Sequence, residues 1–293
     1  MIRKTYALEL ITPCFCAGAD PAKAEIRAPS IRGQLRWWFR ALGGSASDEA
    51  AVFGSVAGDD NSTSSSIRVA VSDFKKGPIW NPPTIDQNSP QNYTWHFAAA
   101  SGKAANAGPK VTGPRWQPQG AIPPKSTFKV TITTIRPLRD DQSARLCLVI
   151  DAFLAFGTIG LRSTRGLGAF SCNSSRPWKE LITPLEKADF TIALRQSPDT
   201  FPNWESALRD WSSWLRYKFR KENKAERYSA LGGIVPRRQA SAVRFRPILL
   251  PTGQFTWVAL EAPHNRILGQ KTSKVLSSTI LTGPAPAAPP RSR

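Results

Sequence analysis

Arginines recur at every fourth position in the segment Ser-Ile-Arg-Gly-Gln-Leu-Arg-Trp-Trp-Phe-Arg near the start of the chain. On a helix that Ser30 caps, Arg32, Arg36 and Arg40 form one basic stripe. None of them has an acidic residue four positions later, so the helix itself supplies no ion pair. Gly33 would let another backbone pass close to the first turn. The pattern favours binding of an anion such as phosphate, and the alternative is an amphipathic helix with a solvated arginine face.

A second candidate site is the glycine-rich loop Gly-Leu-Arg-Ser-Thr-Arg-Gly-Leu-Gly at 160–168. Glycines permit close approach and positive φ, while the side chains between them supply donors to phosphate or ribose. The candidates are Gly160, Arg162, Ser163, Thr164, Arg165, Gly166 and Gly168. The loop matches neither a dinucleotide fingerprint nor a P-loop, because the required glycine spacing and the Gly-Lys-Ser/Thr are missing. The alternative is a hairpin-like turn with solvated arginines.

A third glycine-rich and then basic segment runs over 231–246 and contains Arg237 and Arg238. We take these two arginines as further candidates for contact with a nucleic acid. Just before this segment, one side of a predicted helix over 203–222 carries Arg209, Arg216 and Arg220. The alternative here is a polar helix face that contacts only solvent.

Side chains for catalysis or metal binding are sparse. His96 and His264 have no evident base partner nearby in the sequence, and isolated histidines are usually structural or exposed. The pair Asp59-Asp60 lies on a serine-rich loop, where solvated acids are more common than metal ligands. The Cys14-x-Cys16 spacing is poor for zinc, so we expect buried, reduced thiols. We therefore expect no catalytic residue, no metal site and no cofactor.

The charge of the chain narrows the class of partner. Forty Lys and Arg against 21 Asp and Glu give a formal net charge of +19. The excess is clustered, because 87–139, 152–179, 227–260 and 262–293 contain no acidic residue. A field of this size favours nucleic acids; a generally basic surface is the alternative, and a membrane surface is weaker still. No apolar run approaches the roughly 20 residues that span a bilayer, so we expect a cytoplasmic protein with no membrane partner.

Elements that would position these residues alternate along the first half of the chain. Periodic apolar residues predict helices, and alternating or β-branched residues predict strands. In chain order these are a strand at 3–12, a helix from Ser30 to Leu42, strands at 67–73 and 127–135, a helix at about 142–156, and a short strand near Phe170. This β-α-β-β-α-β order is ferredoxin-like (RRM-like), an α+β fold with an antiparallel sheet and both helices on one face.

The expected domain organisation is tandem. A first ferredoxin-like domain would cover 1–175, with a long Pro/Gly-rich insertion at 77–125. A smaller and degenerate second module would cover 176–281, where the helix over 203–222 precedes strands at 242–250 and 254–261. The Pro-rich end of the chain, 282–293, reads as a disordered tail.

These segments together resemble the RAMP superfamily. The likeness begins with Thr-Pro-Cys-Phe-Cys-Ala-Gly-Ala-Asp-Pro at 12–21 and continues with Glu-Ile-Arg-Ala-Pro-Ser-Ile-Arg-Gly-Gln-Leu-Arg-Trp-Trp-Phe-Arg-Ala-Leu at 25–42. Val-Phe-Gly-Ser at 52–55, the loop at 160–168, and Leu-Gly-Gly at 231–233 with Arg-Gln-Ala-Ser at 238–241 extend it. Within the superfamily the chain is most similar to the first-numbered subunits of type III-B CRISPR (Cmr) effector complexes.

The resemblance implies tandem RRM-like modules and a place at the head of such a complex, near the 3′ end of the guide RNA. It implies contact with guide (CRISPR) RNA and target RNA, association with other RAMP subunits, and cleavage of the target by those neighbours. RNA contact is carried over to Arg27, Ser30, Arg32, Gly33, Arg36, Gly160, Arg162, Ser163, Thr164, Arg165, Gly166 and Gly168. Trp37, away from the core side of its helix, is a further candidate because it could stack a base or seat a partner, as is Arg40.

Two rival functions remain open at this point. One is an endoribonuclease of the RAMP type that processes CRISPR transcripts without a metal. The other is an assembly subunit whose basic faces meet acidic neighbours.

Overall fold

The structure is a computed structural model, and it falls into two compact units. It describes residues 3–18, 20, 23–55, 62–83, 85, 88–95, 121–195, 200–222, 230–232, 241–269 and 272–287. Unit 1 comprises 1–80, 119–161 and 167–189; unit 2 comprises 81–118, 162–166 and 190–293. The expected first domain ended at residue 175, whereas unit 1 continues through a short helical segment to Asp189.

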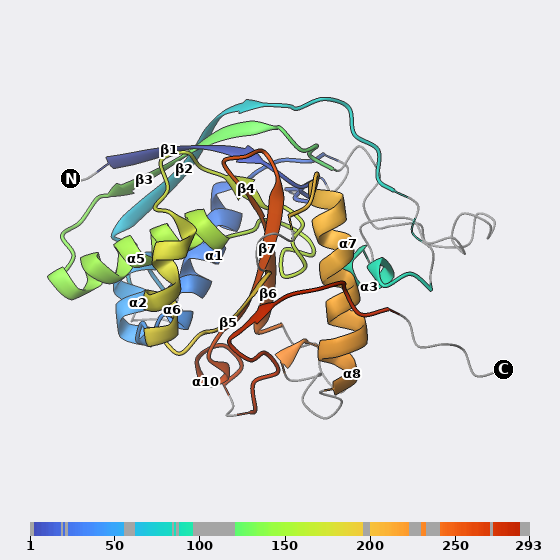
Figure 1. The fold of residues 1–293 in the computed structure, drawn as a ribbon. Helices are drawn as coiled ribbons and strands as arrows, with labels where there is room; N and C mark the ends of the chain where they lie inside the picture. The colour runs from blue at the N-terminus through green and yellow to red at the C-terminus, as the bar shows by residue number, and fades with distance from the viewer. Residues whose placement is uncertain are drawn as a thin grey trace. The chain divides into compact units, whose positions relative to one another are not determined.

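Unit 1 is built on a four-stranded antiparallel sheet in the order β2-β3-β1-β4 (Figure 1). The strands are β1 (Arg3–Leu10), β2 (Ile67–Lys75), β3 (Thr127–Thr134) and β4 (Phe170–Ser171). In the centre of the sheet Leu8 of β1 lies opposite Phe128 of β3, and both are buried. Alternation along β1 therefore places every second side chain in the core and the others on the opposite face.

Helices of unit 1 cover one face of this sheet (Figure 1). They are α1 (Ala28–Ala41), α2 (Ala46–Phe53), α5 (Asp140–Phe156), the short 3-10 helix η2 (Trp178–Leu181) and α6 (Ile182–Lys187). α1 packs against α5, and its Leu35, Trp38 and Phe39, which recur at helical spacing, are buried. The strand order, the pairing and the two long helices confirm the ferredoxin-like expectation for this half of the chain.

Unit 2 repeats the strand order with a second sheet, β6-β7-β5-β8. Its strands are β5 (Thr191–Arg195), β6 (Val243–Leu249), β7 (Phe255–Glu261) and β8 (Thr279–Leu281). α7 (Trp204–Trp214) packs on β6 and β7, where Trp211 stacks on Phe245 with ring centroids 4.7 Å apart. Taken from β5 onward, the order β-α-β-β and then a last strand confirms the predicted second module.

One pairing in unit 2 departs from the expected antiparallel sheet. β8 pairs with β5 in parallel, and the helix that the structure describes in the segment before it is the four-residue α10 (His264–Ile267). In a complete ferredoxin-like module the second helix carries the chain back along the sheet before the last strand. α10 is too short for that crossing, so β8 runs antiparallel to β7 and hence parallel to β5.

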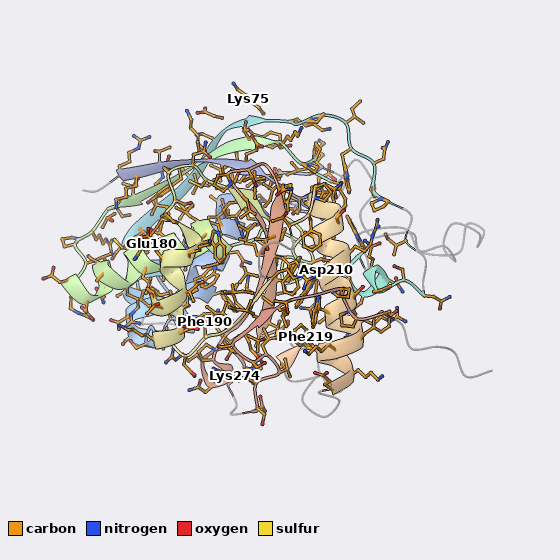
Figure 2. The ribbon with its side chains drawn as sticks, in the orientation of Figure 1. Lys75, Glu180, Phe190, Asp210, Phe219 and Lys274 are labelled. Carbon is orange, nitrogen blue, oxygen red and sulfur yellow. The ribbon has the colours of Figure 1, made fainter. Side chains whose placement is uncertain are left out.

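The long helix of unit 2 changes its winding partway along. α7 passes without a break into the π-helical stretch η3 (Leu215–Phe219) and then into α8 (Arg220–Glu222). Figure 2 shows Asp210 from α7 and Phe219 from η3 on this one continuous helix. The short helix α3 (Gln91–Trp95) packs against α7, and Thr94 of α3 is hydrogen-bonded to Ser212 over 2.8 Å between their hydroxyl oxygens.

Candidate nucleic-acid interface

α1 begins two residues before the start at Ser30 that the sequence indicates. The helix begins at Ala28, Arg27 stands at the N-cap with extended backbone, and Pro29 occupies the first turn. The expectation that Ser30 caps the helix is therefore wrong. Proline fits the first turn because its missing N–H would have no partner there anyway. Ser30 instead lies within the helix, where its hydroxyl accepts a hydrogen bond from the Cys16 thiol over 3.6 Å.

A glycine interrupts the exposed side of α1. Gly33 is exposed, and a Cβ placed on it would have no heavy atom within 4 Å. Arg36 and Trp37 follow one helical turn later and are half-buried, and Arg40 follows after a second turn and is exposed. The ring of Trp37 meets that of Trp38 edge-on, with centroids 5.1 Å apart. Glycine is unfavourable in a helix unless a close approach needs it, so this face has room for a ligand backbone beside two cations.

The arginines of α1 have partners outside their own helix, contrary to the expectation of unpaired charges. Glu49 of α2 lies 2.7 Å from Nη2 of Arg36 and 3.5 Å from Nε of Arg40. Arg32 donates to the carbonyl of Phe53, also on α2. Ser45 begins α2 by accepting a hydrogen bond from the backbone N–H of Asp48 over 3.1 Å.

The charge on this face nevertheless remains positive. One carboxylate, whose side chain is 7% exposed, serves two guanidinium groups whose side chains are 37% and 49% exposed. Glu49 can neutralise one of these two charges and leaves the other in excess. Arg36 also uses its Nε for Glu49, over 2.7 Å, so a phosphate on this face would compete with the carboxylate for planar guanidinium donors.

Two thiols lie close to the start of α1. A hydrogen bond to Cys14 lowers the pKa of Cys16 from 9.0 to about 6; burial opposes the shift, and the Ser30 hydroxyl and Arg27 support it. The same bond, together with burial, raises the pKa of Cys14 well above its usual value. Cys14, Cys16 and Cys172 are buried as expected, whereas Cys147 is exposed. The surroundings at the start of α1 therefore favour ionisation of Cys16 over that of Cys14.

The glycine-rich loop is divided between the two units. Gly160 and Gly168 belong to unit 1, and Arg162 to Gly166 belong to unit 2. Gly168 has φ +70°, and a Cβ there would lie 1.8 Å from the carbonyl oxygen of Ile159. Gly166 has φ +88°, and its Cβ would lie 2.5 Å from the ring of Phe245. Internal packing alone is thus sufficient reason for glycine at both positions.

Arg165 is buried inside unit 2, whereas the sequence predicted a donor to RNA, with a solvated arginine of a turn as the alternative. It is 2% exposed, and its Nη2 donates to the carbonyl of Leu231 over 2.6 Å and to the Tyr93 hydroxyl over 3.0 Å. Its Nη1 lies 3.2 Å from the Ser241 hydroxyl and 3.3 Å from the carbonyl of Val243. A guanidinium so enclosed cannot meet an RNA phosphate at the surface of the structure. The sequence could not reveal this, because its partners are up to 78 residues away.

The rest of the loop is more accessible. Arg162, Ser163 and Thr164 are half-buried. Arg162 has φ +59°, and its Nε donates to the carbonyl of Thr94 over 3.0 Å. The carbonyl of Thr164 accepts a hydrogen bond from the backbone N–H of Phe245. Arg237 and Arg238 lie outside the described residues.

His264 has the base partner that the sequence analysis missed. Glu261, three residues earlier, lies 2.7 Å from His264 Nε2, and the Thr272 hydroxyl lies 2.6 Å from Nδ1. Glu261 also accepts hydrogen bonds from the backbone N–H groups of Val275 and Leu276. The spacing of an acid and a histidine three apart was the available signal. Both side chains are buried, 0% and 2% exposed, so the pair anchors the segment after β7 and cannot reach a polymer.

Other candidates for chemistry are few in the part of the chain that the structure describes. His96, Asp59 and Asp60 fall outside it. Within it, no group of three His, Cys, Asp or Glu side chains could hold a metal ion. The same residues include no helix long and apolar enough to cross a bilayer.

A known family model matches the part of the chain that contains most of unit 1. The model of the RAMP superfamily matches residues 7–171, which run from within β1 to the end of β4. The match covers more than half of the 293 residues. The chain belongs to the RAMP superfamily.

Two curated relatives of this RAMP chain are Cmr subunits of Pyrococcus furiosus. The subunit Cmr1-2 is 37% identical over 89 residues, an alignment that covers 27% of this chain and 46% of the relative. The subunit Cmr1-1 is 28% identical over 186 residues, covering 57% of this chain and 44% of the relative. The RAMP chain thus spans about half the length of the curated relatives it matches.

Solved structures share the fold of this RAMP protein over most of its length. Cmr1 from Pyrococcus furiosus in its apo form aligns with a TM-score of 0.53 at 19% identity, covering 89% of this chain and 88% of that one. A chain of the type III-B Cmr-beta complex bound to cognate target RNA also aligns with a TM-score of 0.53, at 12% identity, covering 88% and 94%. At these identities the likeness concerns the fold.

Proposed function

We propose that this RAMP protein is a non-catalytic RNA-binding subunit of a type III-B CRISPR effector complex. In this role it caps the complex near the 3′ end of the guide RNA and supports binding of the target RNA in the cytoplasm. Its partners are guide RNA, target RNA and other RAMP subunits. The relatives named as Cmr subunits and the Cmr-beta chain found with target RNA support this choice of complex.

The observation that carries the proposal is the exposed face of α1. It combines an open glycine with Arg36 and Arg40, which share a single carboxylate. A phosphodiester backbone fits such a face, because it needs close approach and planar cationic donors but no base-specific pocket. The net charge of +19 adds a long-range attraction of the same sign.

Binding rather than cleavage is favoured by the chemistry that the described residues offer. The histidine–carboxylate pair at His264 and Glu261 is enclosed, and its hydrogen bonds are used to hold backbone. A general base must come within hydrogen-bond reach of the 2′-hydroxyl that it activates. The rival endoribonuclease function is an outcome of the test below, which includes His96, Asp59 and Asp60.

The test measures retention of labelled guide RNA by the full chain at several salt concentrations. In Arg36→Gln/Arg40→Gln each glutamine keeps an N–H donor for Glu49 but removes a charge. Affinity should fall for all RNA sequences alike, and the salt slope should fall by about 0.7 for each lost phosphate contact. The matched control is Arg136→Gln/Lys187→Gln, which removes two charges from exposed positions of the same unit.

Equal retention and slope for the two double variants would remove α1 from the RNA interface. If the wild-type chain does not retain guide RNA, the result would favour the rival function of an assembly subunit. Cleaved RNA that becomes intact in a His96→Ala/Asp59→Ala/Asp60→Ala variant would support the endoribonuclease.

A further inference from the structure

Three arginines of unit 2 surround one tyrosine ring. The guanidinium carbon of Arg220 on α8 lies 4.1 Å from the ring centroid of Tyr93 on α3. Those of Arg165 and Arg162, from the glycine-rich loop, lie 5.1 and 5.2 Å from the same centroid. Two segments distant in sequence thus bring three positive charges to one aromatic side chain on a third segment.

The charges of this cluster are not balanced by the acids that the structure describes. None of Arg162, Arg165 and Arg220 forms an ion pair with a described Asp or Glu. Nη2 of Arg162 is buried and has no hydrogen-bond partner among the described residues. The side chain of Arg220 makes no hydrogen bond to any of them. Buried donors of this kind usually have a partner, and like charges at this range repel.

The environment of the cluster reflects this imbalance. Burial first, and Arg165 next, lower the pKa of Arg162 to about 10. Burial raises the pKa of Tyr93, but the positive charges of Arg165, Arg220 and Arg162 lower it overall. The surroundings therefore favour a negative charge at this position, and the Tyr93 hydroxyl responds to that field.

The three arginines differ in what they can still bind. Both terminal nitrogens of Arg165 are engaged with protein groups, and its Nη2 holds the Tyr93 hydroxyl in place. Arg162 uses Nε for the carbonyl of Thr94, its Nη2 is enclosed, and its Nη1 has no hydrogen bond to a described residue. Arg220 is half-buried and contributes only its contact with the ring. Arg162 and Arg220 can therefore donate hydrogen bonds to a ligand. Arg165 and Tyr93 hold these two arginines in position.

We propose that Arg162, Arg220 and Tyr93 form a phosphate-binding site, and that it takes a phosphate of the RNA backbone. Two planar guanidinium groups suit the tetrahedral phosphate, which can accept from both at once. The tyrosine ring fixes their spacing, and its hydroxyl is held by accepting from Arg165 over 3.0 Å and donating to the Leu231 carbonyl over 3.4 Å. The identity of the occupant rests on the proposed function, whereas the anion site itself stands on the geometry of unit 2.

The anion site is tested without RNA by titrating tyrosine in the full chain, using the tyrosinate absorbance that is lost in Tyr93→Phe. Sulfate is the probe, because its charge does not change over the titration, and chloride at equal ionic strength is the control. Bound sulfate offsets the guanidinium field, so the pKa of Tyr93 should rise by about 1, a roughly tenfold change in its ionisation constant. Arg220→Gln should abolish the rise.

The occupant is tested by RNA retention. Arg220→Gln should weaken guide RNA binding by roughly tenfold, the worth of one charged hydrogen bond, and should reduce the salt slope by about 0.7. Arg209→Gln, an exposed arginine of α7 in the same unit, is the matched control and should bind as the wild type.

Each outcome decides one of the two proposals. If sulfate does not change the pKa of Tyr93 and Arg220→Gln binds RNA as well as the wild type, the anion site is overturned and the proposed function still stands. Tyr93 already ionised at neutral pH also overturns it, because the phenolate would then be the anion. A sulfate effect in a wild-type chain that retains no RNA keeps the anion site and overturns RNA as its occupant.

Discussion

Replacing Arg165 by alanine tests whether the glycine-rich loop is a structural part of unit 2. Its guanidinium is 2% exposed, so solvent does not screen its contacts. The substitution removes two short bonds, to the carbonyl of Leu231 and to the hydroxyl of Tyr93, and three longer ones. At about 1.5–3 kcal/mol for a buried bond from a charged donor, the two short ones alone suggest a loss of about 3–6 kcal/mol. Relief of repulsion from Arg162 reduces this value only in part.

The assay is urea unfolding followed by tryptophan fluorescence, with Arg209→Ala as the exposed control. Arg209→Ala should stay within about 0.5 kcal/mol of the wild type, as surface substitutions do. A second readout separates charge from packing. The pKa of Tyr93 should rise in Arg165→Ala, because burial remains while the largest positive neighbour is gone. A loss below about 1 kcal/mol together with an unchanged Tyr93 titration would refute the buried role and return Arg165 to the surface candidates.

Three further outcomes follow from the described contacts. Cys16→Ser should remove a thiolate absorbance that titrates near pH 6. The free energy of unfolding that this thiolate adds should be present above pH 9 and lost as the pH falls through 6, and urea unfolding across that range would check it. Glu261→Ala should cost about 3 kcal/mol and speed hydrogen exchange at Val275 and Leu276, whose N–H groups it accepts; unchanged exchange would contradict this. Gly168→Ala should destabilise the free chain by at least about 1–3 kcal/mol, because its Cβ would overlap the Ile159 carbonyl; a normal melting temperature would show that the loop has room.

Local patterns were sufficient for most of the fold. The apolar spacing of Leu35, Trp38 and Phe39 predicted the buried side of α1, and β-branched residues predicted β3 within one residue of its ends. α2 was missed although Ser45 followed by Asp48 and Glu49 is an N-terminal helix signal, because the segment is short and serine-rich. The parallel pairing of β8 depends on the length of the preceding connection, which apolar periodicity does not report.

The candidate sites were predicted less completely, because tertiary contacts decide which arginines remain available. Arg36 and Arg40 lack acidic neighbours along α1, yet Glu49 reaches both from the next helix. Arg165 looked equivalent to Arg162 in the loop, but only Arg165 is enclosed. Tyr93 lies in the Pro/Gly-rich insertion and was not predicted as a site residue. The three arginines around its ring come together only in the folded chain.

The π-helical stretch at Leu215–Phe219 has a consequence for how this protein can vary in length. An extra residue in an α-helix would turn everything after it by about 100°. A π turn takes up such a residue locally, so Trp211 before it and Arg220 after it keep their directions. A relative with one residue fewer here could close the stretch into an ordinary α-helix and still present the same two faces. A single-residue gap in alignments of this helix is therefore expected at 215–219. There a residue can be inserted or deleted while the side chains on either side keep their directions.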